Sequence, residues 1–273
     1  MHSSRAQLPF ICREIRKDIF QMINQAQCGH LGGSLSCVEI LVSLYFTVMN
    51  IDPAHPNLEG RDRFVNSKGH ATAAYYATLA NRGYFQRENL ITRFISLFSS
   101  FEEHGSTQVP GVDISTGSLG QGISVGAGMA LSAKLMNSDF RAFVLIGDGE
   151  CQEGQIWEGA MFASHYALDN LIVIVDRNGM QVSGPTEEIL AVEPLGAKWE
   201  SFNWETFTVN GHDTTQVSTC ISSLLQNGKP KVIIASTVKG RGISFMENNP
   251  DFHSYRSLSD EELKTARREL GLE

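Results

Sequence analysis

Two short polar sequences could together bind a metal ion and a diphosphate. The first is Gly-Asp-Gly at 147–149, and the second contains Asn178. A carboxylate and an amide oxygen are hard ligands that suit Mg²⁺, and phosphates, water and a backbone carbonyl usually complete its coordination shell. Gly149 allows the backbone to approach a phosphate closely, and the N-terminus of a following helix favours an anion. The sequence therefore predicts a Mg²⁺–diphosphate site that includes Asp148 and Asn178.

Each polar sequence follows a continuous apolar run that is typical of a buried strand. The runs cover 142–146 and 171–175, and residues 153–166 between them fit a helix. One strand–helix–strand unit takes about thirty residues, which matches the spacing of the two polar sequences. If the strands are neighbours, Asp148 and Asn178 project into the crevice where open parallel sheets bind ligands. The alternative is that Asp148 only caps a helix and Asn178 only lies in a turn, and the combined pattern disfavours it.

Similar apolar runs alternate with helical patterns elsewhere in the chain. The expected helices cover 9–27, 37–49, 123–135, 214–226, a segment after 70 and a capped segment at 259–270, and the expected strands include 63–66, 207–209 and 232–235. This alternation predicts an α/β fold in which a parallel β-sheet has helices on both faces. Residues 29–34 and 100–122 are expected to be loops, and the second is long enough to be functional. No linker is visible, so residues 1–273 are expected to form a single domain.

The composition excludes several other classes of protein. With a net charge of −8, the 273 residues offer no basic stripe for a nucleic acid, so no nucleic-acid partner is expected. No stretch approaches the roughly 20 apolar residues of a membrane span, and no signal-peptide pattern is visible. The five cysteines form no CxxC pair, which favours reduced cysteines. A cytoplasmic protein without membrane contact is expected.

Three further motifs, together with Gly-Asp-Gly and the later Asn, resemble the transketolase family of thiamine diphosphate enzymes. They are Gly-His-Leu-Gly-Gly-Ser at 29–34, Asp-Arg-Phe with Ser-Lys-Gly-His within 62–70, and Pro-Gly-Val-Asp-Ile-Ser-Thr-Gly-Ser-Leu-Gly-Gln-Gly at 110–122. They occur in that family's order, and the resemblance spans nearly the whole chain. It implies a thiamine diphosphate-binding domain equivalent to the N-terminal domain of a transketolase.

The resemblance implies which residues hold the cofactor. Asp148, Asn178 and the backbone carbonyl of Met180 match the metal ligands, for Mg²⁺ with Ca²⁺ or Mn²⁺ able to substitute. Gly149 matches a diphosphate contact. Two residues of the 110–122 motif, Gly117 and Leu119, match positions whose backbone touches the aminopyrimidine ring.

The resemblance also implies roles for histidines and glutamates. His30, His70 and His253 match histidines that contact diphosphate or sugar hydroxyls near the reactive carbon. Imidazole can exchange protons near neutral pH, which suits that position. Glu153 and Glu158 match interface glutamates that couple the two active sites of a dimer. Glu153 could also be a carboxylate that the first turn of a helix favours.

Two departures from the family's pattern lie on the substrate side. The family's loop carries Gly-His-Pro-Glu, where this chain has Glu-Glu-His-Gly at 102–105 and one residue fewer before Pro110. His104 is the candidate for the family's loop histidine. His253 is followed by Ser-Tyr-Arg rather than glycine. These departures indicate an unusual sugar donor or acceptor. The remaining loop histidines, His55 and His212, are expected to be solvated.

The family's activating glutamate belongs to a second α/β domain that this chain does not contain. Because the capped helix at 259–270 resembles a finished end, the expectation is an enzyme of two chains. The implied protein is a transketolase subunit that moves a two-carbon ketol unit from a ketose or its phosphate to an aldose or its phosphate. Its implied partner is a C-terminal subunit with the pyrimidine-binding and C-terminal domains, in an assembly of two copies of each chain.

Two alternatives remain at this point. One is another thiamine diphosphate enzyme, such as the α chain of a 2-oxo acid dehydrogenase or a deoxyxylulose-phosphate synthase-like protein. The loops around His30 and His70 favour transketolase over the dehydrogenase chains. The other alternative is a non-catalytic scaffold of the same fold, against which the retained Asp148, Gly149 and Asn178 argue. The pattern does not specify the sugar pair.

Overall fold

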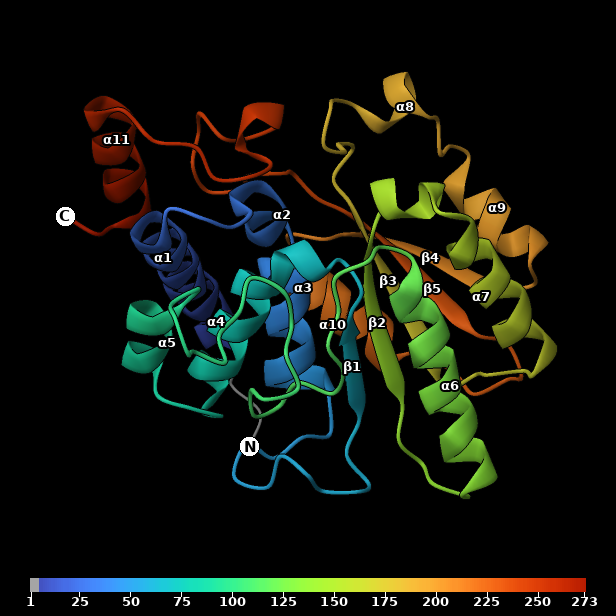
Figure 1. The fold of residues 1–273 in the computed structure, drawn as a ribbon. Coiled ribbons are helices and arrows are strands. Elements are labelled where there is room, and N and C mark those ends of the chain that lie inside the picture. Colours follow the sequence, from blue (N-terminus) through green and yellow to red (C-terminus); the bar gives the residue numbers. More distant parts are fainter. Residues whose placement is uncertain (1–4) are drawn as a thin grey trace.

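The computed structural model describes residues 5–273, which are organised around one five-stranded parallel sheet (Figure 1). The spatial order of the strands is β1-β2-β3-β5-β4, and all four neighbouring pairs are parallel. The strands are Arg63–Asn66 (β1), Ala142–Gly147 (β2), Leu171–Arg177 (β3), Glu205–Asn210 (β4) and Lys231–Ser236 (β5). The predicted parallel sheet is confirmed, and the predicted neighbours β2 and β3 are paired directly.

Helices cover both faces of the sheet, as the continuous apolar strands predict (Figure 1). The layer on one face contains α1 (Leu8–Ala26), α2 (Leu31–Ser36), α3 (Val38–Ser43), α4 (Thr72–Arg82), α5 (Arg87–Arg93), α10 (Thr214–Ser222) and α11 (Asp260–Leu270). The layer on the other face contains α6 (Gln121–Leu135), α7 (Gly154–His165) and α9 (Leu195–Ser201). The short segments are η1 (Arg5–Gln7), η2 (Leu44–Val48), η3 (Gly69–Ala71), η4 (Gly149–Gln152), α8 (Thr186–Ile189) and η5 (Pro250–Phe252).

The strands divide the buried apolar side chains between two cores. In β2, Phe143 and Leu145 belong to the core under α1 and α4, whereas Val144 and Ile146 belong to the core under α6 and α7. This alternation follows from the two-residue period of a strand. Both faces of β2 are therefore buried, and the polar residues that can meet a ligand are confined to the ends of the strands.

One expected loop is partly helical. Residues 29–34 were expected to form a loop before a helix at 37–49, but α2 already begins at Leu31. A Cβ atom on Gly33 would lie 2.8 Å from Nε2 of His70, so this glycine allows two segments to pack closely inside a helix. The rest of the expected helix is divided into α3 and the π-helical η2.

The final helix begins as predicted. The side chain of Ser259 accepts a hydrogen bond from the Glu262 backbone N–H, and the Glu262 side chain accepts one from the Ser259 N–H, which is a complete capping box. No helix within residues 5–273 combines the length and the apolar character that crossing a membrane requires. The five cysteines are all unpaired.

Candidate functional site

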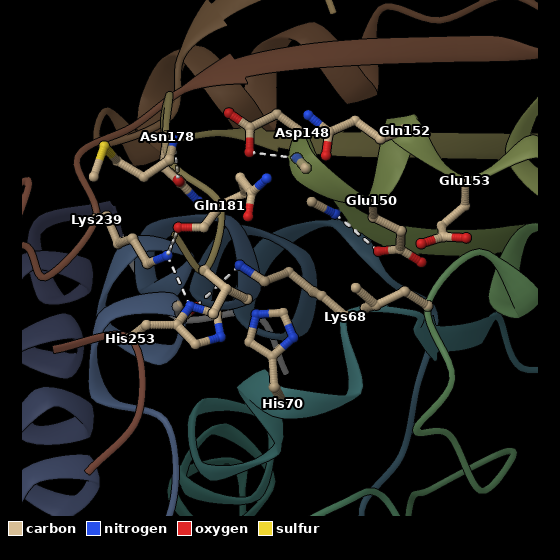
Figure 2. Close-up of a pocket in the computed structure, with 16 residues that line it drawn as sticks. Lys68, His70, Asp148, Glu150, Gln152, Glu153, Asn178, Gln181, Lys239 and His253 are labelled. Carbon is tan, nitrogen blue, oxygen red and sulfur yellow. Dashed lines mark hydrogen bonds between the residues drawn. The ribbon is translucent and has the colours of Figure 1, made fainter. Parts of the chain in front are cut away.

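The carboxyl ends of β2 and β3 form one wall of a cavity, here called the strand-edge cavity (Figure 2). Because Gly147 of β2 pairs with Asp176 of β3, the residues that follow each strand lie at the same edge. The predicted site residues that line this cavity are His70, Leu119, Asp148, Gly149, Glu153, Asn178, Met180 and His253. Eight of the sixteen residues that line the cavity were therefore named from the sequence, three of them from spacing (Asp148, Gly149 and Asn178) and the others from the family resemblance.

Asp148 is held in place by three hydrogen bonds. Its Oδ1 accepts from the Gly149 N–H at 2.8 Å, and its Oδ2 accepts from the Gly179 N–H at 2.6 Å and from Nη1 of Arg177 at 2.8 Å. Burial raises the pKa of Asp148, and the hydrogen bond from Arg177 opposes this rise. A carboxylate offers about four acceptor positions, so one position remains for a cation.

Asn178 is oriented by a buried network around Asp176. Its Nδ2 donates to Oδ2 of Asp176 at 3.2 Å, and its Oδ1 accepts from the Met180 N–H at 3.0 Å. Asp176 is fully buried and pairs with the buried Lys68. Burial opposes its charge, but Lys68 lowers the pKa of Asp176 below its ordinary value. This network fixes the amide nitrogen of Asn178 and leaves its oxygen as the ligand atom.

The sequence did not single out Asp176 or Lys68 as site residues. Asp176 also accepts hydrogen bonds from Ser36 Oγ at 2.6 Å and from Thr237 Oγ1. Lys68 donates to the carbonyl of Gly33 at 3.0 Å. Two separate signals were available, an acidic residue at the end of an apolar run and the Ser-Lys-Gly-His motif that contains Lys68, but neither indicates that the two residues pair.

Glu150 is a second buried carboxylate that the sequence did not reveal. It accepts hydrogen bonds from the Gly147 N–H at 3.0 Å, the Gly120 N–H at 2.8 Å and Oγ of Ser67. Burial raises its pKa, and these hydrogen bonds oppose the rise. Glu150 joins the Gly-Asp-Gly turn to the loop that ends at Gly120 and to the segment before His70.

Three predicted histidines form a cluster, here called the histidine cluster. Its members are His30, His70 and His253, and their ring centroids lie 5.3 to 5.5 Å apart. Burial lowers the pKa of His70 well below its ordinary value. Burial, with the nearby charge of Lys239, lowers the pKa of His253 to about 3. Neutral imidazoles can both donate and accept hydrogen bonds, which suits recognition of hydroxyl groups.

Lys239 is a further cavity residue that the sequence analysis missed. Its Nζ lies 2.8 Å from Nδ1 of His253 and 3.3 Å from the carbonyl of Gln181. Burial, reinforced by the charge of Lys68, lowers the pKa of Lys239 to about 8. Two buried lysines beside one cavity favour an anionic ligand. The available signal was the glycine-rich loop after β5, where Lys239 precedes Gly240.

The remaining predicted residues lie around the cavity or away from it. Gly117 packs against η3, because a Cβ atom on Gly69 would approach its backbone nitrogen to 2.9 Å. His104 is exposed, and its ring lies near Gly117. Glu153 is exposed at the edge of the cavity. Glu158 is exposed and lies in a separate groove between α6 and α7.

The expectation for His212 was wrong. Its side chain is only 14% exposed, and Nδ1 lies 2.9 Å from Oε2 of Glu39. Its Nε2 accepts a hydrogen bond from the Val238 N–H at 2.8 Å. The loop after β4 packs onto α3, a contact between segments far apart in the sequence, so the polarity of the local sequence was misleading.

Residues 5–273 contain no group of three or more His, Cys, Asp or Glu side chains arranged to hold a metal ion. A metal here would depend on Asp148, Asn178 and a backbone carbonyl, completed by oxygens of a ligand. The fixed carboxylate, the fixed amide and the neighbouring lysines fit a Mg²⁺–diphosphate group. Figure 2 shows Asp148 and Asn178 on one side of the cavity and His70 and His253 on the other.

The fold and the cavity define an α/β domain suited to a cofactor that carries a diphosphate. A family model described as "Transketolase, thiamine diphosphate binding domain" matches residues 10–273. The chain belongs to the transketolase family.

Several bacterial relatives are similar over most of their length. The chain is 42% identical to one of the subunits of an apulose-4-phosphate transketolase from Phocaeicola vulgatus, over 87% of this chain and 85% of that protein. It is 43% identical to a 6-deoxy-6-sulfo-D-fructose transketolase subunit of Clostridium sp., over 94% of this chain and 93% of that protein. Both relatives are named as subunits.

The solved structures that match belong to longer proteins. A transketolase from Pichia stipitis, in complex with sedoheptulose 7-phosphate, superposes with a TM-score of 0.90 at 29% identity. The match covers 97% of this chain but 40% of that protein. The chain therefore corresponds to about two fifths of the solved enzyme, and its fold is that of the transketolase N-terminal region.

Proposed function

We propose that this chain is the thiamine diphosphate-binding subunit of a two-chain transketolase. The assembled transferase would move a two-carbon ketol unit from a ketose or ketose phosphate to an aldose or aldose phosphate. The observation that carries the proposal is the placement of Asp148 and Asn178 in one cavity with two buried lysines and two members of the histidine cluster, His70 and His253. The family match and the subunit names of the bacterial relatives support it.

The chain's own residues would anchor the cofactor. Asp148, Asn178 and the carbonyl of Met180 would bind Mg²⁺, or Ca²⁺ or Mn²⁺ in its place. Gly149 and Lys239 would contact the diphosphate, and the backbone of the loop before α6 would contact the aminopyrimidine ring. Thiamine diphosphate, when bound, supplies the carbon centre that stabilises the electron pair released when the sugar's carbon–carbon bond breaks.

The histidine cluster would act on the sugar. Burial keeps these imidazoles neutral near pH 7, so each ring nitrogen can accept or donate a hydrogen bond according to its tautomer. His30, His70 and His253 would bind sugar hydroxyls and move protons at the hydroxyl oxygens next to the reacting carbonyl. His104, which is exposed near Gly117, would reach the same ligand.

The partner would be a subunit with the pyrimidine-binding and C-terminal domains, in an assembly of two copies of each chain. The subunit-length relatives and the longer single-chain structures support this division. Exposed Glu153 and Glu158 would lie at subunit contacts. The substrates named for the relatives, apulose 4-phosphate and 6-deoxy-6-sulfo-D-fructose, are an unusual pentose and a sulfonated sugar. We therefore extend the proposal to a modified sugar or sugar phosphate.

The test begins with co-purification of the partner chain. Transfer from D-xylulose, D-xylulose 5-phosphate or D-fructose 6-phosphate to glycolaldehyde is then measured with thiamine diphosphate and Mg²⁺. Transfer should require both chains, and efficient transfer by this chain alone would overturn the two-chain proposal. Asp148→Ala should abolish Mg²⁺-dependent cofactor binding in calorimetry, whereas Asp139→Ala, at an exposed site, should bind as the parent does. Undiminished binding by Asp148→Ala would refute the metal assignment.

A further inference from the structure

Glu103 places a carboxylate beside the histidine cluster. Its Oε1 lies 3.1 Å from Nδ1 of His30, and 31% of the Glu103 side chain is exposed. The contact is not an in-line hydrogen bond, and the buried Nδ1 has no hydrogen-bond partner among residues 5–273. The imidazole and the carboxylate are thus in contact, but this contact leaves Nδ1 of His30 without a hydrogen bond.

The imidazole ring of His30 lies between this carboxylate and the histidines that line the strand-edge cavity. The ring of His30 packs edge-on against His70 at 5.5 Å and against His253 at 5.3 Å, and both of those residues line the cavity. The two cations of the cavity, Lys68 and Lys239, are buried within its lining. Phosphate oxygens would therefore meet positive charge inside the cavity, whereas a group beside His30 would meet the negative charge of Glu103.

His30 does not neutralise that negative charge near pH 7. Burial lowers the pKa of His30, Glu103 raises it, and His104 and Lys239 lower it further, with the net result below the ordinary value. The groups that face His30 are Glu103, His104, Lys239, His70 and His253. Above neutral pH the imidazole is therefore uncharged, and Glu103 is the one acidic group among the described residues that face it.

We propose that Glu103 is a specificity-determining residue, which favours an uncharged hydroxyl group and disfavours a carboxylate or phosphate on the carbon next to the reacting carbonyl. A hydroxyl can donate a hydrogen bond to His30 or Glu103, whereas an anion offers no proton and is repelled. A phosphate at the far end of a longer sugar is unaffected. This inference rests on the proposed ketol transfer.

The kinetic test compares two acceptors of equal length in the two-chain enzyme. With D-xylulose as the uncharged donor, glycolaldehyde carries a hydroxyl next to its aldehyde, and glyoxylate carries a carboxylate there. Glu103→Gln should raise the ratio of kcat/KM for glyoxylate to that for glycolaldehyde about tenfold, because it removes a like charge at short range. Glu102→Gln, at the exposed neighbouring position, is the matched control and should leave the ratio unchanged.

An unchanged ratio in Glu103→Gln, or an equal change in Glu102→Gln, would overturn the proposal. A second measurement does not depend on catalysis. NMR titration of the full chain, with the His30 signal assigned from a His30→Asn spectrum, should show a lower pKa for His30 in Glu103→Gln and no change in Glu102→Gln. An unmoved His30 titration overturns the inference by itself. A shifted His30 titration in an enzyme that shows no ketol transfer would refute the proposed function, but it would still support the contact between Glu103 and His30.

Discussion

Replacing Glu150 by glutamine should destabilise the chain although the shape of the side chain hardly changes. Oε1 of Glu150 accepts from the Gly120 N–H and from Oγ of Ser67, and Oε2 accepts from the Gly147 N–H. In glutamine one of these oxygens becomes an NH₂ group, which is itself a donor. The least costly orientation keeps the amide oxygen at the position of Oε1, where it still accepts two hydrogen bonds. The NH₂ group then faces the Gly147 N–H, and that one hydrogen bond is lost.

The expected loss can be estimated from the environment of this carboxylate. Glu150 is 2% exposed, so no bulk water replaces the missing acceptor. A hydrogen bond to a charged group contributes about 1.5–3 kcal/mol. Burial raises the pKa of Glu150, which means that burying its charge is unfavourable. Replacing the charged carboxylate by a neutral amide therefore recovers part of this free energy. The net decrease in the free energy of unfolding should be about 2 kcal/mol, which for a chain of 273 residues corresponds to a fall of about 3–4 °C in Tm.

Urea and thermal unfolding of the full chain measure this effect. Glu200→Gln, at an exposed position on α9, is the control and should unfold as the parent does. Because Glu150 joins the Gly-Asp-Gly turn to the loop before α6, Glu150→Gln should also bind thiamine diphosphate more weakly. If Glu150→Gln were as stable as the parent, the hydrogen bonds from Ser67, Gly120 and Gly147 to the carboxylate would not contribute to stability. That result would refute the prediction.

The other predictions concern buried charges. Burial disfavours the charged form of Glu39, but its hydrogen-bonding partners lower its pKa from 4.5 to about 2. The stabilisation it provides is present above pH 4.5 and should fall by about 3 kcal/mol toward pH 2, which urea unfolding of the parent and Glu39→Gln can measure. Lys68→Met should cost about 3–5 kcal/mol in urea unfolding, because Asp176 loses its cation in a buried site, and a loss under about 1 kcal/mol would contradict this. Binding of inorganic pyrophosphate to the full chain should weaken as the pH rises through about 8, where Lys239 loses its proton, and the Lys239→Met variant should lack that pH dependence.

The sequence predicted the part of the site that depends on local order along the chain. A strand, a polar turn, a helix and the next strand follow one another around Asp148 and Asn178, so adjacency of β2 and β3 was enough to bring them together. The loops that resemble the transketolase family supplied His30, His70 and His253.

The parts that the sequence did not predict depend on contacts between distant segments. Lys68 and Asp176 are 108 positions apart, and nothing in either local sequence indicates the other. Lys239 follows a different strand and reaches the cavity only because β5 lies next to β3. The helical start at Leu31 was missed because two glycines favour a loop locally, whereas close packing against His70 requires Gly33.

The most direct test of the central claim is a crystal structure of the two-chain enzyme with thiamine diphosphate and Mg²⁺. We expect the Asp148 carboxylate and the Asn178 amide oxygen to lie within about 2.0–2.1 Å of the ion, and the diphosphate to occupy the strand-edge cavity. An ion bound without either side chain, or a diphosphate bound outside that cavity, would contradict the account.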